Sequence, residues 1–184
     1  WGFTTGSYQV PDEETIQTLL TKVDYTQIQY DEASGNVTIS EGMTIDLGSI
    51  AKGYAGELAA RTLRDKGVTS ALLNLGGMYR RSVLSRTDQP GSSASRTRKS
   101  RHCMMGLSVT DQAVVTSGGY ERYFEQDGHT YWHIMDPATG HPAKSGLLSV
   151  TVVGDKGGIC DALSTSLFVM GLIKSYDSGR SDAS

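Results

Sequence analysis

The sequence has few of the residues that cross-link small folds or bind metals through sulfur. Its 184 residues include only two cysteines and four prolines. Cys103 and Cys160 lack the paired spacing of a zinc site, which leaves a disulfide or two unrelated thiols, and we favour the thiols. No Walker A, GxGxxG or GxSxG pattern occurs, so these common nucleotide-binding and hydrolase signatures are excluded.

Long apolar runs are also missing. No stretch approaches eighteen apolar residues, so the sequence predicts no membrane-spanning segment. Trp1 is not preceded by an initiator Met or by the basic and apolar regions of a signal peptide, and we expect the chain to begin inside a longer or processed protein. The composition, 38% apolar and 20% charged, is typical of a globular domain with a real core.

Charge is unevenly spread along the chain. The formal net charge is −3, yet residues 78–105 hold seven of the seventeen basic residues. This Ser-, Arg- and Gly-rich segment has neither helical nor strand periodicity, and we expect a disordered basic loop, which is uncommon inside a compact domain. A basic interaction arm for nucleic acid is an alternative, but Tyr79 is its only aromatic residue, and we predict no nucleic-acid partner.

Hydrophobic periodicity predicts an α+β fold, a mixed α/β sheet with packed helices, in a single domain over residues 1–184. The predicted helices are 12–23, 49–67 and 158–172; the predicted hairpins are 28–40 and 120–136; the predicted strands are 43–47, 68–75, 113–117 and 147–153. Gly67 occupies the position of a helix-ending glycine. Leu163, Leu167 and Met170 would form the apolar face of the last helix, and we expect the tail 174–184 to be frayed.

The first candidate site is the segment 46–53, DLGSIAKG. A strand would end at Asp46, turn through Gly48 and open a helix whose free N–H groups attract phosphate. Lys52 in the first helical turn opposes the helix dipole, and an anionic ligand would explain it. The alternative is that Asp46 or Ser49 only caps the helix and that Lys52 is a solvated surface residue.

The second candidate site is the pair Asp161 and Thr165 on the last predicted helix. Positions i and i+4 share one helix face, so a carboxylate and a hydroxyl would present two hard oxygen ligands suited to Mg²⁺. In the structural alternative, Asp161 favours the helix N-terminus electrostatically and Thr165 bonds a backbone carbonyl.

Two further segments could carry chemistry. His133 stands at a strand end beside a tight turn and could act as a base near neutral pH; alternatively it is a surface histidine next to a turn starting at Asp136. The small residues 116–119 would let a ligand approach the backbone closely.

Five ordered blocks bring these segments together. They are DLGSIAKGYA, ALLNLGG, AVVTSGGYERYFEQDGHTYWHIMDPATGHPA, LLSVTVVG and CDALSTSLFVMG. In this order they resemble the ApbE family of FAD:protein FMN transferases, over about residues 42–77 and 106–172. The resemblance implies an ApbE-like flavin transferase fold, incomplete here because the family has a longer N-terminal part.

The resemblance also implies a role for seven positions. They are the FAD contacts Asp46, Lys52 and Met135, the magnesium ligands Ser49 (through its backbone carbonyl), Asp161 and Thr165, and the histidine needed for transfer, His133. Ser164 stands where some members have a further acid.

The implied function is magnesium-dependent transfer of FMN from FAD to a Thr or Ser hydroxyl of an acceptor flavoprotein, with release of AMP. The alternatives are a Mg–FAD binding protein and an FAD pyrophosphatase that uses water. The resemblance suggests a subunit of a membrane-associated redox complex as acceptor, and a periplasmic or membrane-anchored location in the bacterial cell envelope. Residues 78–105 depart from the family pattern as a frameshifted segment would, and on that hypothesis the incomplete chain would be inactive.

Overall fold

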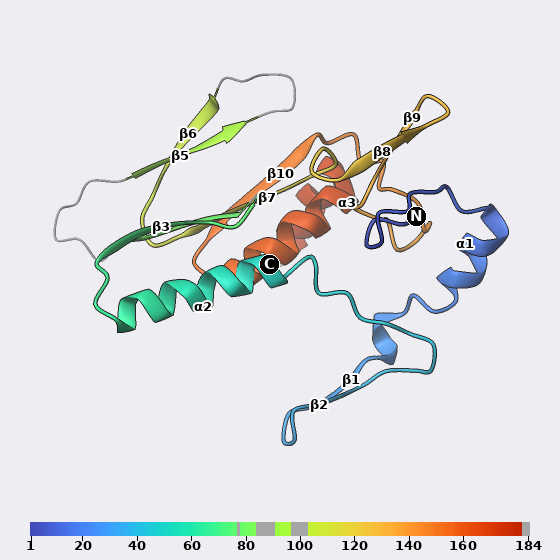
Figure 1. The fold of residues 1–184 in the computed structure, drawn as a ribbon, viewed down its shortest axis with the longest axis horizontal. Helices are drawn as coiled ribbons and strands as arrows, with labels where there is room; N and C mark the ends of the chain where they lie inside the picture. Colours follow the sequence, from blue (N-terminus) through green and yellow to red (C-terminus); the bar gives the residue numbers. More distant parts are fainter. Residues whose placement is uncertain (77, 84–90, 97–102, 182–184) are drawn as a thin grey trace. The chain divides into compact units, whose positions relative to one another are not determined.

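The computed structural model describes residues 1–76, 78–83, 91–96 and 103–181 (Figure 1). The chain divides into two compact units. Unit 1 comprises Trp1–Asp46 and Arg122–Lys144, and unit 2 comprises Leu47–Glu121 and Ser145–Ser184. The mixture of helices and antiparallel strands confirms the predicted α+β class.

Unit 1 consists of short elements. They are α1 (Glu13–Leu20), the 3₁₀ helix η1 (Tyr25–Gln27), the hairpin β1 (Gln29–Asp31) and β2 (Asn36–Thr38), and the hairpin β8 (Tyr123–Gln126) and β9 (His129–Trp132). The Asp12 carboxylate caps α1 by accepting the Thr15 N–H at 2.7 Å. Asp127 and Gly128 both have positive φ, 51° and 75°, as the tight turn of the predicted second hairpin requires.

Aromatic rings hold unit 1 together. Phe124 is buried, and its ring stacks on those of Tyr8 and Tyr131 with centroids 5.2 Å away in each case. Phe3 adds a tilted ring at 5.5 Å from Phe124, and Trp1 lies 5.4 Å from Tyr131. The N-terminal segment is therefore packed onto the β8–β9 hairpin mainly by ring contacts.

Unit 2 contains the longer helices and the main sheet. Its elements are α2 (Ala51–Asp65), β3 (Ser70–Asn74), β4 (Met78–Val83), β5 (Gly91–Arg96), β6 (Cys103–Val109), β7 (Ala113–Gly118), β10 (Ser149–Gly154) and α3 (Gly157–Ser181). The sheet has the order β10-β7-β4-β3 with antiparallel neighbours, and β5 pairs separately with β6. α3 packs on β7 and β10, α2 packs on β3 and β4, and the two helices contact each other, so they share one face of the sheet (Figure 1).

Small residues let the two helices of unit 2 approach closely. The buried residues of α2 are Gly53, Gly56 and Ala60. A Cβ atom added at Gly53 would lie 2.1 Å from the backbone oxygen of Gly157, at the start of α3. The helices therefore meet backbone to backbone at their first turns, in a contact that only glycine permits.

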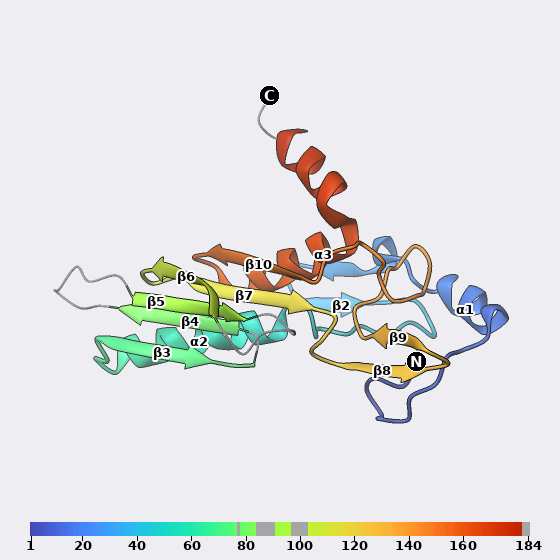
Figure 2. The ribbon, with the colours of Figure 1, turned by 90° about the horizontal axis from the view of Figure 1, so that it is seen from above.

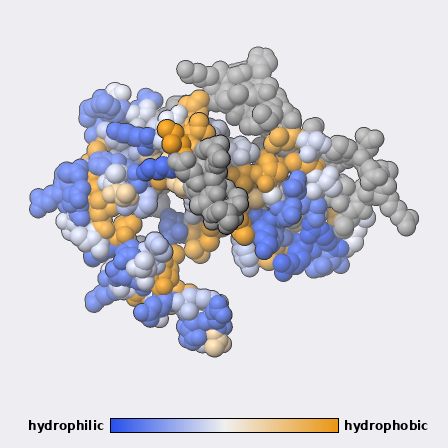
Figure 3. Space-filling view, turned by 180° about the vertical axis from the view of Figure 1, so that it is seen from behind, coloured by the Kyte–Doolittle hydropathy of each residue, from blue (hydrophilic) through white to orange (hydrophobic). Residues whose placement is uncertain are grey.

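The apolar stripe of α2 faces outward. Ile50, Tyr54 and Leu58 fall on this stripe, and all three are exposed, Tyr54 by 59%. Apolar areas lie among hydrophilic ones on the face drawn in Figure 3. Packing of α2 in unit 2 thus depends on its small residues and not on its large ones.

The end of α2 follows the sequence closely. Gly67 has a φ of +80°, and the Val68 N–H donates to the Leu63 carbonyl at 3.0 Å. This six-to-one bond with a left-handed glycine is the Schellman ending, so the predicted role of Gly67 is confirmed.

α3 is broken at Gly171, where φ is +78° and ψ is 171°. Figure 2 shows the second half of the helix leaving the direction of the first. Among the described residues, one segment, Gly157–Ser175, is long and apolar enough to cross a membrane by length and composition alone. It also carries the buried polar residues Asp161 and Ser164 against α2 and β7, and we interpret its first half as the core helix of unit 2.

Two predictions about strands are wrong. Residues 43–47 form no strand, because no described strand pairs with them and a strand exists only through pairing. The described residues within 78–105 do not form a structureless loop, since they contain β4, β5 and the start of β6. Backbone hydrogen bonds between strands need no side-chain periodicity, which is why the sequence pattern missed them. Residues 84–90 and 97–102 lie outside the described part.

Two predictions about α3 are also wrong. The chain is helical again after the break at Gly171 and stays helical to Ser181 instead of fraying from residue 174, because a break at one positive-φ glycine lets a second helical stretch start directly after it; residues 182–184 lie outside the described part. Leu163 and Met170 are exposed, and the buried residues of this helix include Cys160, Asp161, Ser164 and Phe168. Asp161 and Ser164 are both hydrogen-bonded. Which side chains of this helix are buried therefore depends on which ones face α2 and the sheet, and not on their hydropathy.

Candidate functional site

A carboxylate of α3 caps the beginning of α2. The Gly53 N–H donates to Asp161 Oδ2 at 2.8 Å, and this bond is buried. Ile50 at the N-cap of α2 makes no side-chain capping bond, so Asp161 supplies from another helix the acceptor that a first-turn N–H needs. The contact joins the two predicted segments that contain Lys52 and Asp161.

Asp161 is only 2% exposed. Burial raises the pKa of its carboxyl above the ordinary 3.8, while the Gly53 N–H and the positive charge of Lys52 act in the opposite direction. Burying a charged carboxylate is costly unless positive charge or donors compensate it. The position therefore suits a bound cation next to an anionic ligand.

Three hydroxyl groups continue the site from Asp161 toward the sheet. Ser117 Oγ of β7 lies 2.7 Å from Ser164 Oγ and 3.1 Å from Thr165 Oγ1. Ser164, which is fully buried, also donates to the backbone carbonyl of Asp161 at 2.9 Å. The hydroxyls are thus hydrogen-bonded to one another and to the backbone carbonyl of Asp161, the residue whose carboxylate caps α2.

The donor set of this cluster fits Mg²⁺. The Asp161 carboxylate and the half-buried Thr165 hydroxyl are hard oxygen donors one helical turn apart. Within the described residues no group of three His, Cys, Asp or Glu side chains gathers as a cation site, so a cation here would depend on mixed oxygen ligands. Ser49 lies in the exposed turn four residues before Gly53, and its role as a third ligand stays a prediction.

The predicted FAD contacts Asp46 and Lys52 are both exposed. Lys52 is the second residue of α2 and is near enough to Asp161 for its charge to act on that carboxyl. Asp46 is the last residue of the N-terminal part of unit 1. The structure thus places Lys52 beside the carboxylate cluster and leaves the role of Asp46 as a prediction.

His133 and Met135 belong to unit 1. The His133 Nδ1 lies 3.1 Å from the Arg122 carbonyl, which also accepts the His133 backbone N–H at 3.2 Å. A carbonyl can only accept, so Nδ1 carries a proton in this contact. Met135 forms an isolated antiparallel bridge with Pro142, and this bridge closes the turn that starts at Asp136.

Sequence reasoning missed two residues of the cluster, Gly53 and Ser117. The spacing of Gly53, Gly56 and Ala60 signals a close helix contact, but an outward apolar stripe on the same helix obscured it. Ser117 lies in the segment 116–119, which we noted for the small size of its residues rather than for its hydroxyls. The ring of Tyr120 fills the space at Gly118, since it lies 2.5 Å from where a Cβ atom would stand. The glycine therefore makes room for this ring and not for a ligand.

Comparison with known proteins gives one family. A model described as the ApbE family matches residues 1–181, including the segment 78–105. The chain is 34% identical to an FAD:protein FMN transferase of Treponema pallidum over 95% of this chain and 53% of that protein. It is 35% identical to an FAD:protein FMN transferase of Klebsiella pneumoniae over 95% of this chain and 54% of that protein.

Solved structures agree with the family match. The crystal structure of the ApbE protein from Thermotoga maritima superposes with a TM-score of 0.85 and 34% identity, covering 92% of this chain and 56% of that one. The chain therefore spans about half the length of the relatives that it matches.

Proposed function

This chain belongs to the ApbE family, and from that premise we propose that it takes part in magnesium-dependent transfer of FMN from FAD to a Thr or Ser hydroxyl of an acceptor protein, with release of AMP. Relatives with the name FAD:protein FMN transferase support flavin transfer to a protein. The chain spans about half the length of these relatives, and we propose that this half is active by itself.

The observation that carries the proposal is the buried contact between Gly53 and Asp161. It fixes a carboxylate at the N-terminus of α2, where Lys52 adds a positive charge. A helix N-terminus and a lysine favour the phosphates of a dinucleotide, and the carboxylate favours a cation beside them. Together these groups form a site for a pyrophosphate accompanied by a divalent ion.

We assign the chain's residues as follows. Asp161 and Thr165 hold the ion with the Ser49 carbonyl, and Lys52 binds a phosphate. Asp46 and Met135 contact the rest of FAD. Bound Mg²⁺ would offset negative charge on the pyrophosphate as its P–O–P link breaks.

His133 accepts the proton of the attacking hydroxyl in this scheme. The hydroxyl oxygen bonds to the FMN-side phosphorus, the bond to the bridging oxygen breaks, and AMP departs with that oxygen. The Arg122 carbonyl supports the assignment, because it contacts Nδ1 of the His133 ring, and in a neutral ring with its proton on Nδ1 the nitrogen that accepts a proton is Nε2.

The Asp161→Asn variant tests the metal and FAD assignment. Asparagine keeps an oxygen that can accept the Gly53 N–H but removes the charge, so the fold should persist while Mg²⁺-dependent FAD binding is lost. Fluorescence titration of FAD with and without Mg²⁺ measures this. Equal Mg²⁺-dependent affinity in both proteins would exclude Asp161 as a ligand.

Product analysis tests the reaction itself. The chain is incubated with FAD, Mg²⁺ and a protein that carries the target hydroxyl, and the mass of that protein is measured together with released AMP. A mass increase equal to FMN supports transfer. Free FMN and AMP with an unchanged protein would show FAD hydrolysis, and no AMP would show that the chain only binds FAD or is inactive.

A further inference from the structure

We propose that Ser117 is a positioning residue, which directs the Thr165 hydroxyl so that its oxygen can serve as a cation ligand. The inference rests on the proposed function, since it concerns a ligand of the same ion. It follows from counting protons in the hydroxyl cluster of β7 and α3, where every hydroxyl has one proton to donate.

The Asp161 backbone carbonyl determines which hydroxyl donates and which accepts in this cluster. Ser164 Oγ lies 2.9 Å from the Asp161 backbone oxygen, and a carbonyl oxygen can only accept. The single proton of Ser164 is therefore used in that bond. In its 2.7 Å contact with Ser117, Ser164 must then be the acceptor.

The same count fixes the next step. Ser117 donates its only proton to Ser164, so it must accept in its 3.1 Å contact with Thr165. The bonds thus run from Thr165 to Ser117, from Ser117 to Ser164, and from Ser164 to the Asp161 carbonyl. The hydroxyl proton of Thr165 is held toward the sheet.

This direction matters for metal binding. A neutral hydroxyl binds a cation through an oxygen lone pair, and its proton must point elsewhere. With the proton held by Ser117, both lone pairs of Thr165 Oγ1 are available for other partners. Without Ser117 the Thr165 hydroxyl would need another acceptor, and a helical threonine can turn to a carbonyl of the preceding turn instead. Groups that orient metal ligands in this way are typically worth about 10- to 100-fold in metal affinity.

The neighbouring residue of β7 supplies a matched control. Thr116 Oγ1 lies 2.9 Å from Thr151 Oγ1 of β10, the residue paired with it across the sheet. Successive side chains of a strand point to opposite faces, and Ser117 contacts α3, so the Thr116 pair lies on the other face. Loss of the Thr116 hydroxyl removes a comparable hydrogen bond without touching the cluster.

The experiment measures Mg²⁺ binding to the full chain by calorimetry, without FAD, and the stability of the same proteins in urea. Ser117→Ala should raise the Mg²⁺ dissociation constant by about 10- to 100-fold. Ser117→Thr, which keeps a hydroxyl, should restore most of the affinity. Thr116→Ala should bind Mg²⁺ as the unmodified chain does, while its urea midpoint falls about as much as that of Ser117→Ala.

The outcomes separate this inference from the proposed function. Unchanged Mg²⁺ affinity in Ser117→Ala, or equal loss in Thr116→Ala, would overturn the role of Ser117 and leave the magnesium site standing. No Mg²⁺ binding by the unmodified chain would overturn the role of Ser117 stated here, whereas the proposed function fails only if FAD binding does not depend on Mg²⁺. If Ser117→Ala does not fold, Ser164→Ala decides: without Ser164 the Ser117 proton can turn to Thr165, so affinity should again fall, and unchanged affinity would refute the inference.

Discussion

Unit 1 and unit 2 are packed with opposite kinds of side chain. In unit 1 the rings of Tyr8, Phe124 and Tyr131 stack at 5.2 Å and hold the N-terminal segment against the β8–β9 hairpin. In unit 2 the helices meet at Gly53, where even a methyl group would strike the opposing backbone. Ring contacts are spread over large surfaces and can adjust, whereas a backbone-to-backbone contact has no room to adjust. Changing a large aromatic side chain in unit 1 should therefore cost less stability than adding a single methyl group at Gly53 in unit 2.

The largest effect is expected from Gly53→Ala. The added Cβ would lie 2.1 Å from the Gly157 oxygen and 2.8 Å from the Asp161 Cβ, so α2 and α3 must separate. We expect a loss of about 2 kcal/mol in the free energy of unfolding, the overpacking cost reduced by the better helix propensity of alanine. Urea denaturation measures it.

Gly158→Ala is the matched control for that prediction. A Cβ at Gly158 would meet its nearest neighbour, in Tyr54, at an ordinary 3.8 Å. We expect no loss of stability from this change. A comparable loss in both variants would show that helix-terminal glycines are needed here for reasons other than the close contact.

Phe124→Leu should have a smaller effect although it changes a larger side chain. Leucine keeps an apolar group between the neighbouring rings, and we expect a loss of about 1 kcal/mol, well below the cost of truncation to alanine. Thermal unfolding followed by near-ultraviolet circular dichroism reports on the ring cluster directly. Tyr25→Leu, at a side chain that is 84% exposed, is the control with no expected change. A loss larger than that of Gly53→Ala would break the comparison between the units.

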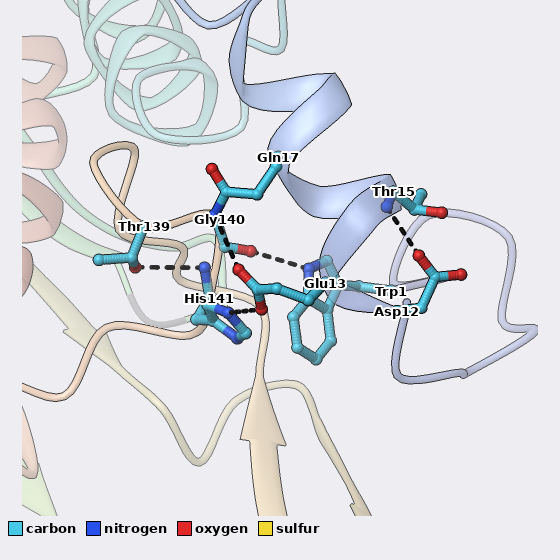
Figure 4. Close-up of polar contacts among 8 residues, drawn as sticks. All are labelled: Trp1, Asp12, Glu13, Thr15, Gln17, Thr139, Gly140 and His141. Atoms are coloured by element: carbon cyan, nitrogen blue, oxygen red, sulfur yellow. Dashed lines mark hydrogen bonds and ion pairs between the residues drawn. The ribbon is translucent and has the colours of Figure 1, made fainter.

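The smallest effect concerns the polar contacts of α1, shown in Figure 4. Glu13 accepts from Gln17 Nε2 at 2.7 Å and lies 3.2 Å from His141 Nε2. The Gln17 hydrogen bond first, and the His141 contact second, hold the pKa of the Glu13 carboxyl below the ordinary 4.5. A carboxyl with a lowered pKa stabilises the folded state above its unfolded pKa, and this contribution is lost as pH falls through the folded value.

Glu13→Gln should therefore be slightly less stable than the unmodified chain near neutral pH, and the two should converge as the pH falls through the lowered folded pKa of Glu13. Melting temperatures over this range measure the difference. Glu14→Gln removes an exposed acid from the same helical turn and should not reproduce the convergence. A constant difference at all pH values would refute the role of the Glu13 contacts.

Local chemistry made much of the fold predictable. The Asp127-Gly128 turn and the glycine ending of α2 each depend on a few neighbouring residues and form where the sequence predicts them, and α1 lies within the predicted helix 12–23 with Asp12 as its cap. The strand predicted at 43–47 failed because pairing partners cannot be seen in a local pattern. The same reason explains β4 within 78–105, since its register with β3 and β7 is a property of the sheet.

In the candidate site, too, the contacts within one helix were predictable and the contacts between distant segments were not. The i to i+4 spacing of Asp161 and Thr165 was visible in the sequence because one helix carries both. The Gly53 bond to Asp161 spans 108 residues, and Ser117 reaches α3 from another strand, so neither could be inferred from spacing. Ser164 is buried although the sequence predicted an apolar buried face for this helix, because its hydroxyl finds hydrogen-bond partners inside unit 2.

The interruption at Gly171 divides α3 into two stretches with separate tasks. Residues before it carry Asp161, Ser164 and Thr165, while Leu172 and Ile173 just after it are exposed. A backbone ladder that is cut at one residue transmits little cooperativity across the cut. The Ser175 hydroxyl, which donates to the Gly171 carbonyl at 2.6 Å, is then one link between the later stretch and the ion-binding turn upstream.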